Sequence, residues 1–281
     1  MTGKLYLCAT PIGNLGDISQ RVLETLAQVD LIAAEDTRNT IKLLNHFAIR
    51  TPMTSYHEYN KVEKAYYLIG KMEAGCNIAL VSDAGTPAIS DPGEVLVAMC
   101  QERQITVTSL PGPVALITAL TLSGLSTRRF CFEGFLSSDK KERSRIMEDL
   151  QKETRTIILY ESPHHLKKTI KQLWDCLGER KIAICRELTK KFETVLRLTL
   201  EEAVDYYEQE QPRGEYVLVI QGKNYADLQQ EEQLKWQNIS LEEHMESYEK
   251  QGISHKDAMK LVAKDRGVSK REVYNKLINN S

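Results

Sequence analysis

Three features that would mark particular classes of protein are missing from this sequence of 281 residues. Its net charge is only −2, from 37 basic and 39 acidic residues, so no overall positive field indicates nucleic acid as a partner, although a local basic patch is compatible with this balance. The longest stretch without a charged side chain, residues 104–127, contains Pro111, Gly112 and Pro113, which argues against a membrane-spanning helix. The N-terminus lacks the pattern of a signal peptide, so we expect a cytoplasmic protein.

Closely spaced cysteines are also missing. The six cysteines never form a Cys-x-x-Cys pair, so we expect buried, reduced thiols and neither a disulfide nor a zinc framework. His57 and Glu58 are adjacent, and His164 and His165 stand elsewhere in the chain, so neither pair has the ligand spacing of a metal site. The sequence therefore predicts no bound metal.

The first part of the chain alternates short apolar runs with stretches of helical periodicity. The apolar runs predict strands at residues 5–9, 31–34, 78–81 and 105–109, and the periodic stretches predict helices at 18–29, 94–101 and 114–122. Strands that alternate with helices are typical of βαβ units. We therefore expect an α/β fold whose first domain, residues 1–122, contains a mostly parallel sheet.

The rest of the chain is predicted to form a second α/β domain, residues 123–223, and a third region, residues 224–281. The same patterns predict strands at 129–133, 156–160, 182–186 and 216–220, and helices at 139–152 and 165–176. The polar stretch 224–237 is interpreted as a linker or an exposed helix, and short helices are predicted at 241–250, 256–264 and 270–277. Ser254 and Ser269 suit helix N-caps, and Gly267 suits a helix end.

Glycine-rich turns follow several of the predicted parallel strands, at residues 10–17, 82–93 and 110–114. In open α/β sheets ligands bind at this edge, and glycine lets the backbone and its N–H donors approach a ligand closely. None of the turns has the G-x-G-x-x-G or Gly-Lys-Ser/Thr pattern of dinucleotide or triphosphate sites. The turns therefore predict a ligand site of another kind, with ordinary strand-to-helix turns as the alternative.

An ordered set of short motifs resembles the ribosomal RNA small subunit methyltransferase I family, which belongs to the tetrapyrrole-methylase (class III) superfamily. The longest motif is residues 82–93, with the sequence SDAGTPAISDPG. The others are residues 9–18, 34–38, 55–58, 110–113, 159–164 and 186–190, and the resemblance as a whole covers about residues 4–222. Relatives that methylate porphyrin precursors or form diphthine usually carry a shorter Gly-Asp-Pro version of the longest motif.

The resemblance implies a two-domain tetrapyrrole-methylase-like fold with a mostly parallel N-terminal sheet, a mixed C-terminal sheet and a small helical C-terminal module. It also implies a homodimer that uses S-adenosylmethionine to methylate the 2′-hydroxyl of a cytidine ribose in the decoding region of 16S ribosomal RNA. The donor would lie in the cleft between the domains. The residues implied to contact it are Pro11, Asp83, Ala84, Gly85, Ile89, Val114, Ala115, Tyr160, Glu161 and Leu188.

The sequence departs from the family pattern at two places. Val114 replaces an expected Ser, so any donor contact there would be through the backbone, and the core of a helix start is the alternative for this position and Ala115. Leu136-Ser137-Ser138 replaces a Phe-Leu-Pro pattern, which leaves the role of that loop open.

A ribose hydroxyl needs help in losing its proton, and several residues are candidates for this role. Glu35 and Asp36 follow a predicted strand, and Arg38 can pair with one of them or hold a phosphate. If consecutive strands are neighbours, this loop lies beside the first glycine turn. A helix cap with a surface ion pair is the alternative. His57 is a further candidate base, or else a hydrogen-bonded loop histidine.

Basic side chains gather near the C-terminus, where residues 253–281 hold seven Lys or Arg against three Asp or Glu. Residues 268–274 resemble the second helix of a helix-turn-helix, so this module is expected to contact RNA phosphates, with packing against a dimer partner as the alternative. Two other functions stay open. One is a small-molecule, tetrapyrrole-like methyltransferase of the same fold, and the other is a non-catalytic RNA-binding assembly factor.

Overall fold

The computed structural model describes residues 2–237 and 239–279. Its contacts divide the chain into two units. The first comprises the chain up to residue 150 together with residues 155–221, and the second comprises residues 151–154 and the chain from residue 222 onward. Among the described residues, no helix combines the length and apolar character needed to cross a membrane.

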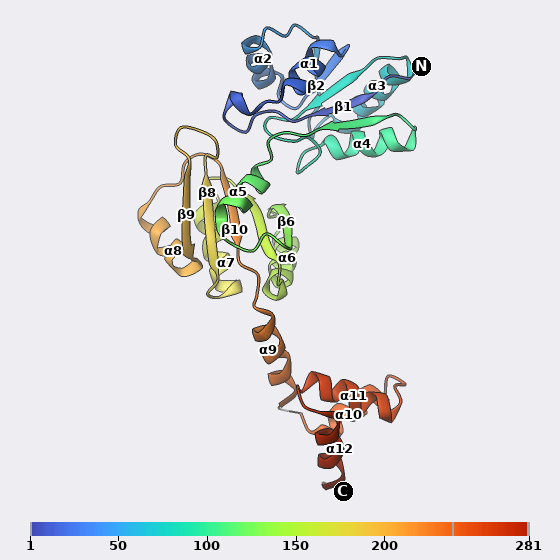
Figure 1. Cartoon of the computed structure of the whole chain (residues 1–281), viewed down its shortest axis with the longest axis vertical. Coiled ribbons are helices and arrows are strands. Elements are labelled where there is room, and N and C mark those ends of the chain that lie inside the picture. The colour runs from blue at the N-terminus through green and yellow to red at the C-terminus, as the bar shows by residue number, and fades with distance from the viewer. Residues whose placement is uncertain (1, 238, 280–281) are drawn as a thin grey trace. The chain divides into compact units, whose positions relative to one another are not determined.

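The first unit begins with a parallel five-stranded sheet (Figure 1). Its order is β3 (Met53–Ser55), β2 (Leu31–Ala34), β4 (Ile78–Val81), β1 (Leu5–Cys8) and β5 (Val107–Leu110). The connecting helices are α1 (Gln20–Gln28), α2 (Thr37–His46), α3 (Lys61–Glu73) and α4 (Gly93–Glu102). Buried clusters lie on both faces of the sheet, which explains why its strands read as continuous apolar runs.

The strand order corrects one expectation. β1 pairs with β4 and β5, so β4 stands between β1 and β2. The residues directly after β2 therefore follow a strand that neighbours β4 and not β1, and the premise that these consecutive strands are neighbours is wrong. The physical reason is that the β1–α1–β2 connection passes over the position later filled by β4. The Glu35 N–H accordingly donates to the Val81 carbonyl at 3.3 Å.

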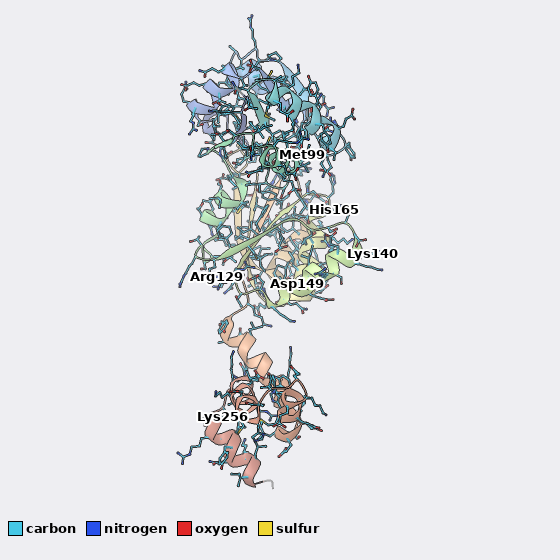
Figure 2. All side chains as sticks on the ribbon, turned by 90° about the vertical axis from the view of Figure 1, so that its right-hand side faces the viewer. Met99, Arg129, Lys140, Asp149, His165 and Lys256 are labelled. Carbon is cyan, nitrogen blue, oxygen red and sulfur yellow. The ribbon has the colours of Figure 1, made fainter. Side chains whose placement is uncertain are left out.

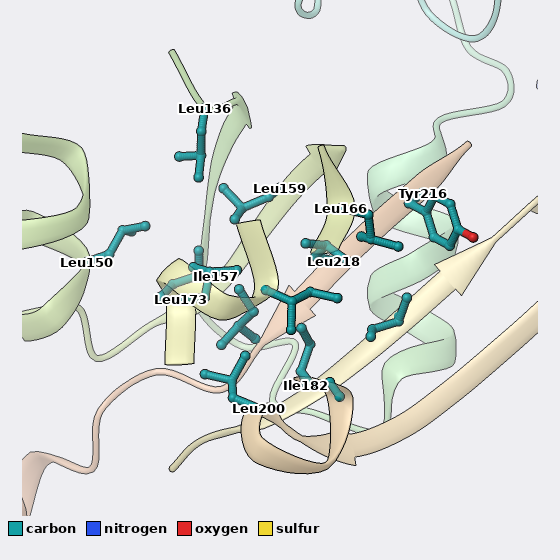
Figure 3. Close-up of a cluster of buried hydrophobic side chains, with 14 of the residues drawn as sticks. Leu136, Leu150, Ile157, Leu159, Leu166, Leu173, Ile182, Leu200, Tyr216 and Leu218 are labelled. Carbon is teal, nitrogen blue, oxygen red and sulfur yellow. The ribbon is translucent and has the colours of Figure 1, made fainter. Parts of the chain in front are cut away.

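The second sheet of this unit is mixed. Its order is β6 (Phe130–Phe135), β7 (Thr156–Glu161), β10 (Tyr216–Ile220), β8 (Lys181–Arg186) and β9 (Thr194–Thr199), and β6–β7 is the parallel pair. One face packs on α6 (Lys140–Lys152), α7 (Leu166–Leu177) and α8 (Leu200–Gln209), whose apolar side chains gather in one core (Figure 3). The predicted α/β class with a parallel first sheet and a mixed second sheet is confirmed.

The other face of the second sheet is covered by α5 (Ala115–Ser123), which runs beside β8 and β10 (Figure 1). Leu116, Ala119 and Leu120 pack there against Val217 and Val219. This helix therefore packs with the second sheet, whereas the sequence boundary assigns most of it to the first domain. The domain boundary at residue 122 stays a prediction, because contacts join both sheets in one unit.

Several elements were not predicted from the sequence, namely α2, β3, α3, β9 and α8. β3 is three residues long and only half-buried, so it shows no apolar run. The start of α8 did carry a signal, because Thr199 and Glu202 form a capping box.

The C-terminal unit contains α9 (Tyr225–Gln237), α10 (Leu241–Glu249), α11 (His255–Asp265) and α12 (Lys270–Asn279). The predicted short helices are confirmed, and the polar stretch before them is helical. Ser254 and Ser269 accept the N–H bonds of Asp257 and Glu272, as expected for N-caps, and Gly267 has a φ of +63°. Figure 2 labels Lys256, which is exposed at the start of α11 in this unit, and Lys140, which begins α6 in the first unit.

Candidate active site

A cavity of about 420 Å³ opens at the carboxyl edge of the parallel sheet, and its walls come from both sheets of the first unit. This volume lies within the roughly 300–1,000 Å³ typical of small-molecule sites. We call it the larger cavity. It brings together predicted site residues that are far apart in the sequence, namely Glu35, Asp83, Ala84, Gly85, Ile89, Val114, Ala115, Tyr160, Glu161 and Leu188.

The other predicted site residues do not line this cavity. Pro11 lines a neighbouring cavity of about 330 Å³, which we call the smaller cavity, whereas its neighbour Ile12 lines the larger one. Asp36 and Arg38 line neither cavity, and the same holds for His57.

Sequence reasoning missed part of the wall. Asp91, Ser162 and Pro163 lie within recognised motifs but were not singled out. Val217 and Cys185 carried no motif, and only strand pairing places Val217 opposite both Tyr160 and Cys185. Such cross-strand neighbours cannot be inferred from local patterns.

The turn after β4 is tied to the turn after β1 through Gly85. The Gly85 N–H donates to the Thr10 carbonyl at 3.0 Å, and the Thr10 N–H donates to the Gly85 carbonyl at 2.9 Å. The Gly85 N–H is therefore occupied within the protein, although Gly85 lines the larger cavity. Gly85 has a φ of +81°, and a Cβ there would stand 3.3 Å from Ile12 Cγ2, so close approach of the two turns is what the glycine permits.

Backbone strain is stored on both sides of the larger cavity. Ala88 and Ser90 have φ values of +66° and +61°, and Glu187 and Thr189 have values of +51° and +65°. Each left-handed residue other than glycine costs on the order of 1–3 kcal/mol, and such residues cluster at functional sites. Asp91 stabilises the turn after β4, since its Oδ1 accepts the Ala88 N–H at 2.9 Å.

The charge of the larger cavity is one-sided. Its described lining contains five carboxylates and no Lys, Arg or His. The carboxylates are those of Glu35, Asp83, Asp91, Glu161 and Glu215. A lining of this kind favours a cationic ligand and disfavours a phosphate.

Glu35 and Asp36 are adjacent in sequence but differ in environment. The Glu35 Oε2 accepts the Asp83 N–H at 3.2 Å at the cavity wall, and burial raises the pKa of Glu35 and of Asp83. Asp36 instead accepts two bonds from the Arg38 guanidinium, at 3.1 and 2.7 Å, which lower its pKa to about 2. Asp36 also caps α2, as the alternative interpretation of this loop expected. Of the two, Glu35 is the stronger base.

His57 has a local structural environment. Its backbone N–H donates to Asn60 Oδ1 at 2.8 Å. Its ring Nδ1 is buried without a hydrogen-bond partner within the part of the chain that the structure describes. Neither cavity includes it. This arrangement matches a loop histidine, and nothing in it links His57 to the acidic lining.

The second sheet supplies a rigid aromatic wall. The Tyr160 ring meets Phe132 and Phe135 edge-on at centroid distances of 4.8 and 5.6 Å, and its hydroxyl accepts the Leu116 N–H at 3.3 Å. Burial raises the pKa of Tyr160, so it stays neutral at physiological pH.

Glu161 beside it is buried, and its carboxylate is held on both oxygens. It accepts the Thr169 hydroxyl at 2.5 Å and the Ser162 N–H at 2.7 Å. Arg143 of α6 in turn donates to the Thr169 hydroxyl at 2.9 Å and so helps to hold Thr169 against Glu161. Among the residues that the structure describes, no group of three His, Cys, Asp or Glu side chains could hold a metal ion.

Comparison with known proteins defines the class. Residues 4–204 match the family model of Tetrapyrrole (Corrin/Porphyrin) Methylases. A crystal structure of diphthine synthase has a TM-score of 0.65 at 13% identity and covers 80% of this chain and 92% of its own. Uroporphyrin-III C-methyltransferase from Thermus thermophilus, complexed with S-adenyl homocysteine, has a TM-score of 0.56 at 17% identity over 78% of this chain and 97% of its own. The protein is a methyltransferase with the tetrapyrrole-methylase fold.

Closer relatives narrow the assignment. Proteins named ribosomal RNA small subunit methyltransferase I are 47% identical over 272 residues in Bacillus subtilis and 48% identical over 273 residues in Synechocystis. These alignments cover 97% of this chain and 93% and 96% of the relatives. The chain belongs to the ribosomal RNA small subunit methyltransferase I family.

Proposed function

We propose that this chain transfers a methyl group from S-adenosylmethionine to the 2′-hydroxyl of a cytidine ribose in the decoding region of 16S ribosomal RNA. The observation that carries the proposal is the acidic larger cavity at the carboxyl edge of the parallel sheet. The names of the relatives support a small-subunit RNA substrate. The choice of a cytidine 2′-hydroxyl rests on the family resemblance of the sequence motifs.

The larger cavity fits the methyl donor in chemistry and size. S-adenosylmethionine carries a positive sulfonium and a positive ammonium, which suit a lining of carboxylates. Ile12, Ile89 and Leu188 offer apolar contacts to its uncharged parts. We assign donor binding to the predicted residues that line this cavity, and a donor contact of Pro11 stays a prediction.

The donor supplies a methyl group that is already activated by its positively charged sulfur. The chain must therefore position the ribose and remove the hydroxyl proton. We assign the proton to Glu35, because it lines the cavity and burial raises its pKa above that of an exposed glutamate. Arg38, whose side chain is 88% exposed, is free on its outer side to meet an RNA phosphate while paired with Asp36.

The C-terminal unit supports the RNA substrate through its charge distribution. Lys256, Lys260 and Lys264 are exposed on α11, and Arg271 and Lys276 are exposed on α12. We propose that these side chains bind RNA phosphates. We also propose, from the family resemblance, that the chain acts in the cytoplasm and forms a homodimer. Light scattering of the purified protein would test the homodimer.

Mass spectrometry of 16S ribosomal RNA tests the proposal. Small subunits lacking the modification are incubated with the protein and a donor that carries a deuterated methyl group. We expect the label on the ribose of one cytidine, and none with Glu35→Gln over the same time. Label on a base, or label on a tetrapyrrole but not on RNA, would overturn the proposal. Binding of the subunit without any transfer would favour the assembly-factor alternative.

A further inference from the structure

The smaller cavity borders the larger one and differs from it in charge. It lies between the first glycine turn and α2, and it shares Ser82 and Asp83 with the larger cavity. Its other polar walls include Thr10 and Thr40, which are 3% and 5% exposed. A polar cavity of about 330 Å³ is large enough for part of a small polar ligand.

Two basic side chains line this cavity. Lys42 and His46 are four residues apart on α2, a spacing that puts them on the same face of the helix. Within the described part of the chain, no side-chain hydrogen bond or ion pair engages the Lys42 ammonium. Its charge is therefore available to a ligand.

The acidic group of the smaller cavity is engaged elsewhere. The Asp36 backbone, the Arg38 charge and the Asn39 side chain, all at the start of α2, favour the charged form of the Asp83 carboxylate. Among the described residues, no ion pair joins Asp83 to Lys42. The larger cavity, by contrast, has carboxylates and no cation in its described lining, so a phosphate is disfavoured there.

We infer that the smaller cavity binds the phosphodiester next to the target ribose, with Lys42 and His46 as the contacting side chains. The inference rests on the proposed function. A ribose whose hydroxyl reaches Glu35 has a charged phosphate on each side. These phosphates must lie outside the larger cavity, because its carboxylates repel them. The two cavities meet at Ser82 and Asp83, and Lys42 lines the smaller one. The smaller cavity thus fixes the register of the RNA strand.

The test compares Lys42→Gln with Lys71→Gln, which removes an exposed lysine of α3 that lines neither cavity. Three quantities are measured: the affinity for small subunits, from single-turnover methylation at increasing subunit concentration; the salt dependence of that affinity; and donor affinity by calorimetry. For Lys42→Gln we expect roughly tenfold or more weaker subunit binding. The slope of log affinity against log salt should fall by about 1. Donor affinity should not change, Lys42→Arg should restore binding, and Lys71→Gln should behave as wild type.

The outcomes separate this inference from the proposed function. Wild-type protein that transfers no methyl to small subunits would remove the proposed function itself. Active wild type with an unaltered subunit affinity and salt slope in Lys42→Gln would overturn the inference alone. Weaker donor binding in Lys42→Gln would also overturn it, because the smaller cavity would then belong to the donor site.

Discussion

The two sheets of the first unit contribute different chemistry to the larger cavity. The parallel sheet presents carboxylates whose pKa values are raised, Glu35 and Asp83, on turns that follow its strands. The mixed sheet presents Tyr160, packed between two rings, and Glu161, already bound on both oxygens. The parallel sheet therefore carries the groups available for proton transfer, and the mixed sheet carries the fixed side chains that shape the site. Changes on the two sides should therefore separate rate from affinity.

The largest effect is expected on the parallel-sheet side, for Glu35→Gln. Loss of a general base typically lowers the rate by ~10²–10⁴-fold. Asp36→Asn is the matched control, because its carboxylate is bound to Arg38 and lines no cavity. Single-turnover methylation of small subunits measures both. Equal rates for the two variants would assign the base elsewhere.

Gly85→Val should abolish measurable donor affinity. The side chain would enter a left-handed position 3.3 Å from Ile12 and 3.4 Å from the Pro113 carbonyl, and would push apart the turns that form the cavity. Gly178→Val is the control for backbone strain alone, because Gly178 has a φ of +69° and open space around its Cβ position. Calorimetry with the donor and thermal unfolding check both variants. Wild-type donor affinity in folded Gly85→Val would contradict the site.

The pH dependence of methylation should report Glu35. Burial raises its pKa above the ordinary 4.5, so the reactive carboxylate is lost at a higher pH than in an exposed glutamate. Below that pKa the single-turnover rate should fall about tenfold per pH unit. Asp36→Asn should leave the midpoint close to that of wild type. A profile flat down to the ordinary pKa would exclude Glu35 as the base.

On the mixed-sheet side, Tyr160→Leu should weaken donor binding with little change in the rate of the bound complex. Loss of the aromatic contacts is worth about 0.5–1.5 kcal/mol, or roughly 2- to 12-fold in affinity. Phe132→Leu is the control, since Phe132 packs on Tyr160 but does not line the cavity. Titration of donor against single-turnover rate separates the two quantities. A large fall in the rate at saturating donor would give Tyr160 a chemical role.

The smallest effect concerns acid stability. The pKa of Asp36 is about 2 because of Arg38, below its ordinary 3.8. The pair therefore stabilises the fold above pH 3.8, and this contribution is lost as the pH falls through about 2. Arg38→Ala should be slightly less stable than wild type at neutral pH and equal to it at the acid limit. Urea unfolding at several pH values measures the difference, and a difference that persists at the acid limit would point to lost packing instead.

At the larger cavity, local patterns predicted the turns of the parallel side but not the cross-strand neighbours of the mixed side. The turn at residues 82–93 could be found because a turn at the end of a strand has a local signature in glycine, proline and aspartate, and the family resemblance then implied Gly85 and Ile89 within it. Val217 and Cys185 could not, because they meet Tyr160 through pairing between strands distant in sequence. β3 was missed because it is three residues long and only half-buried. α3 did carry a helical signal, because its buried side chains Ala65, Leu68, Ile69 and Met72 have the spacing of an amphipathic helix.

The sequence by itself determined the class of fold, the order of the motifs and the family, since these depend on residues close together in the chain. Only the tertiary structure decided that β4 separates β1 from β2, which moves Glu35 next to Asp83. Only the tertiary structure also distinguished Glu35 from Asp36. The physical reason is that a carboxylate's pKa depends on its burial and on its hydrogen-bond partners, and both are set by segments that meet when the chain folds.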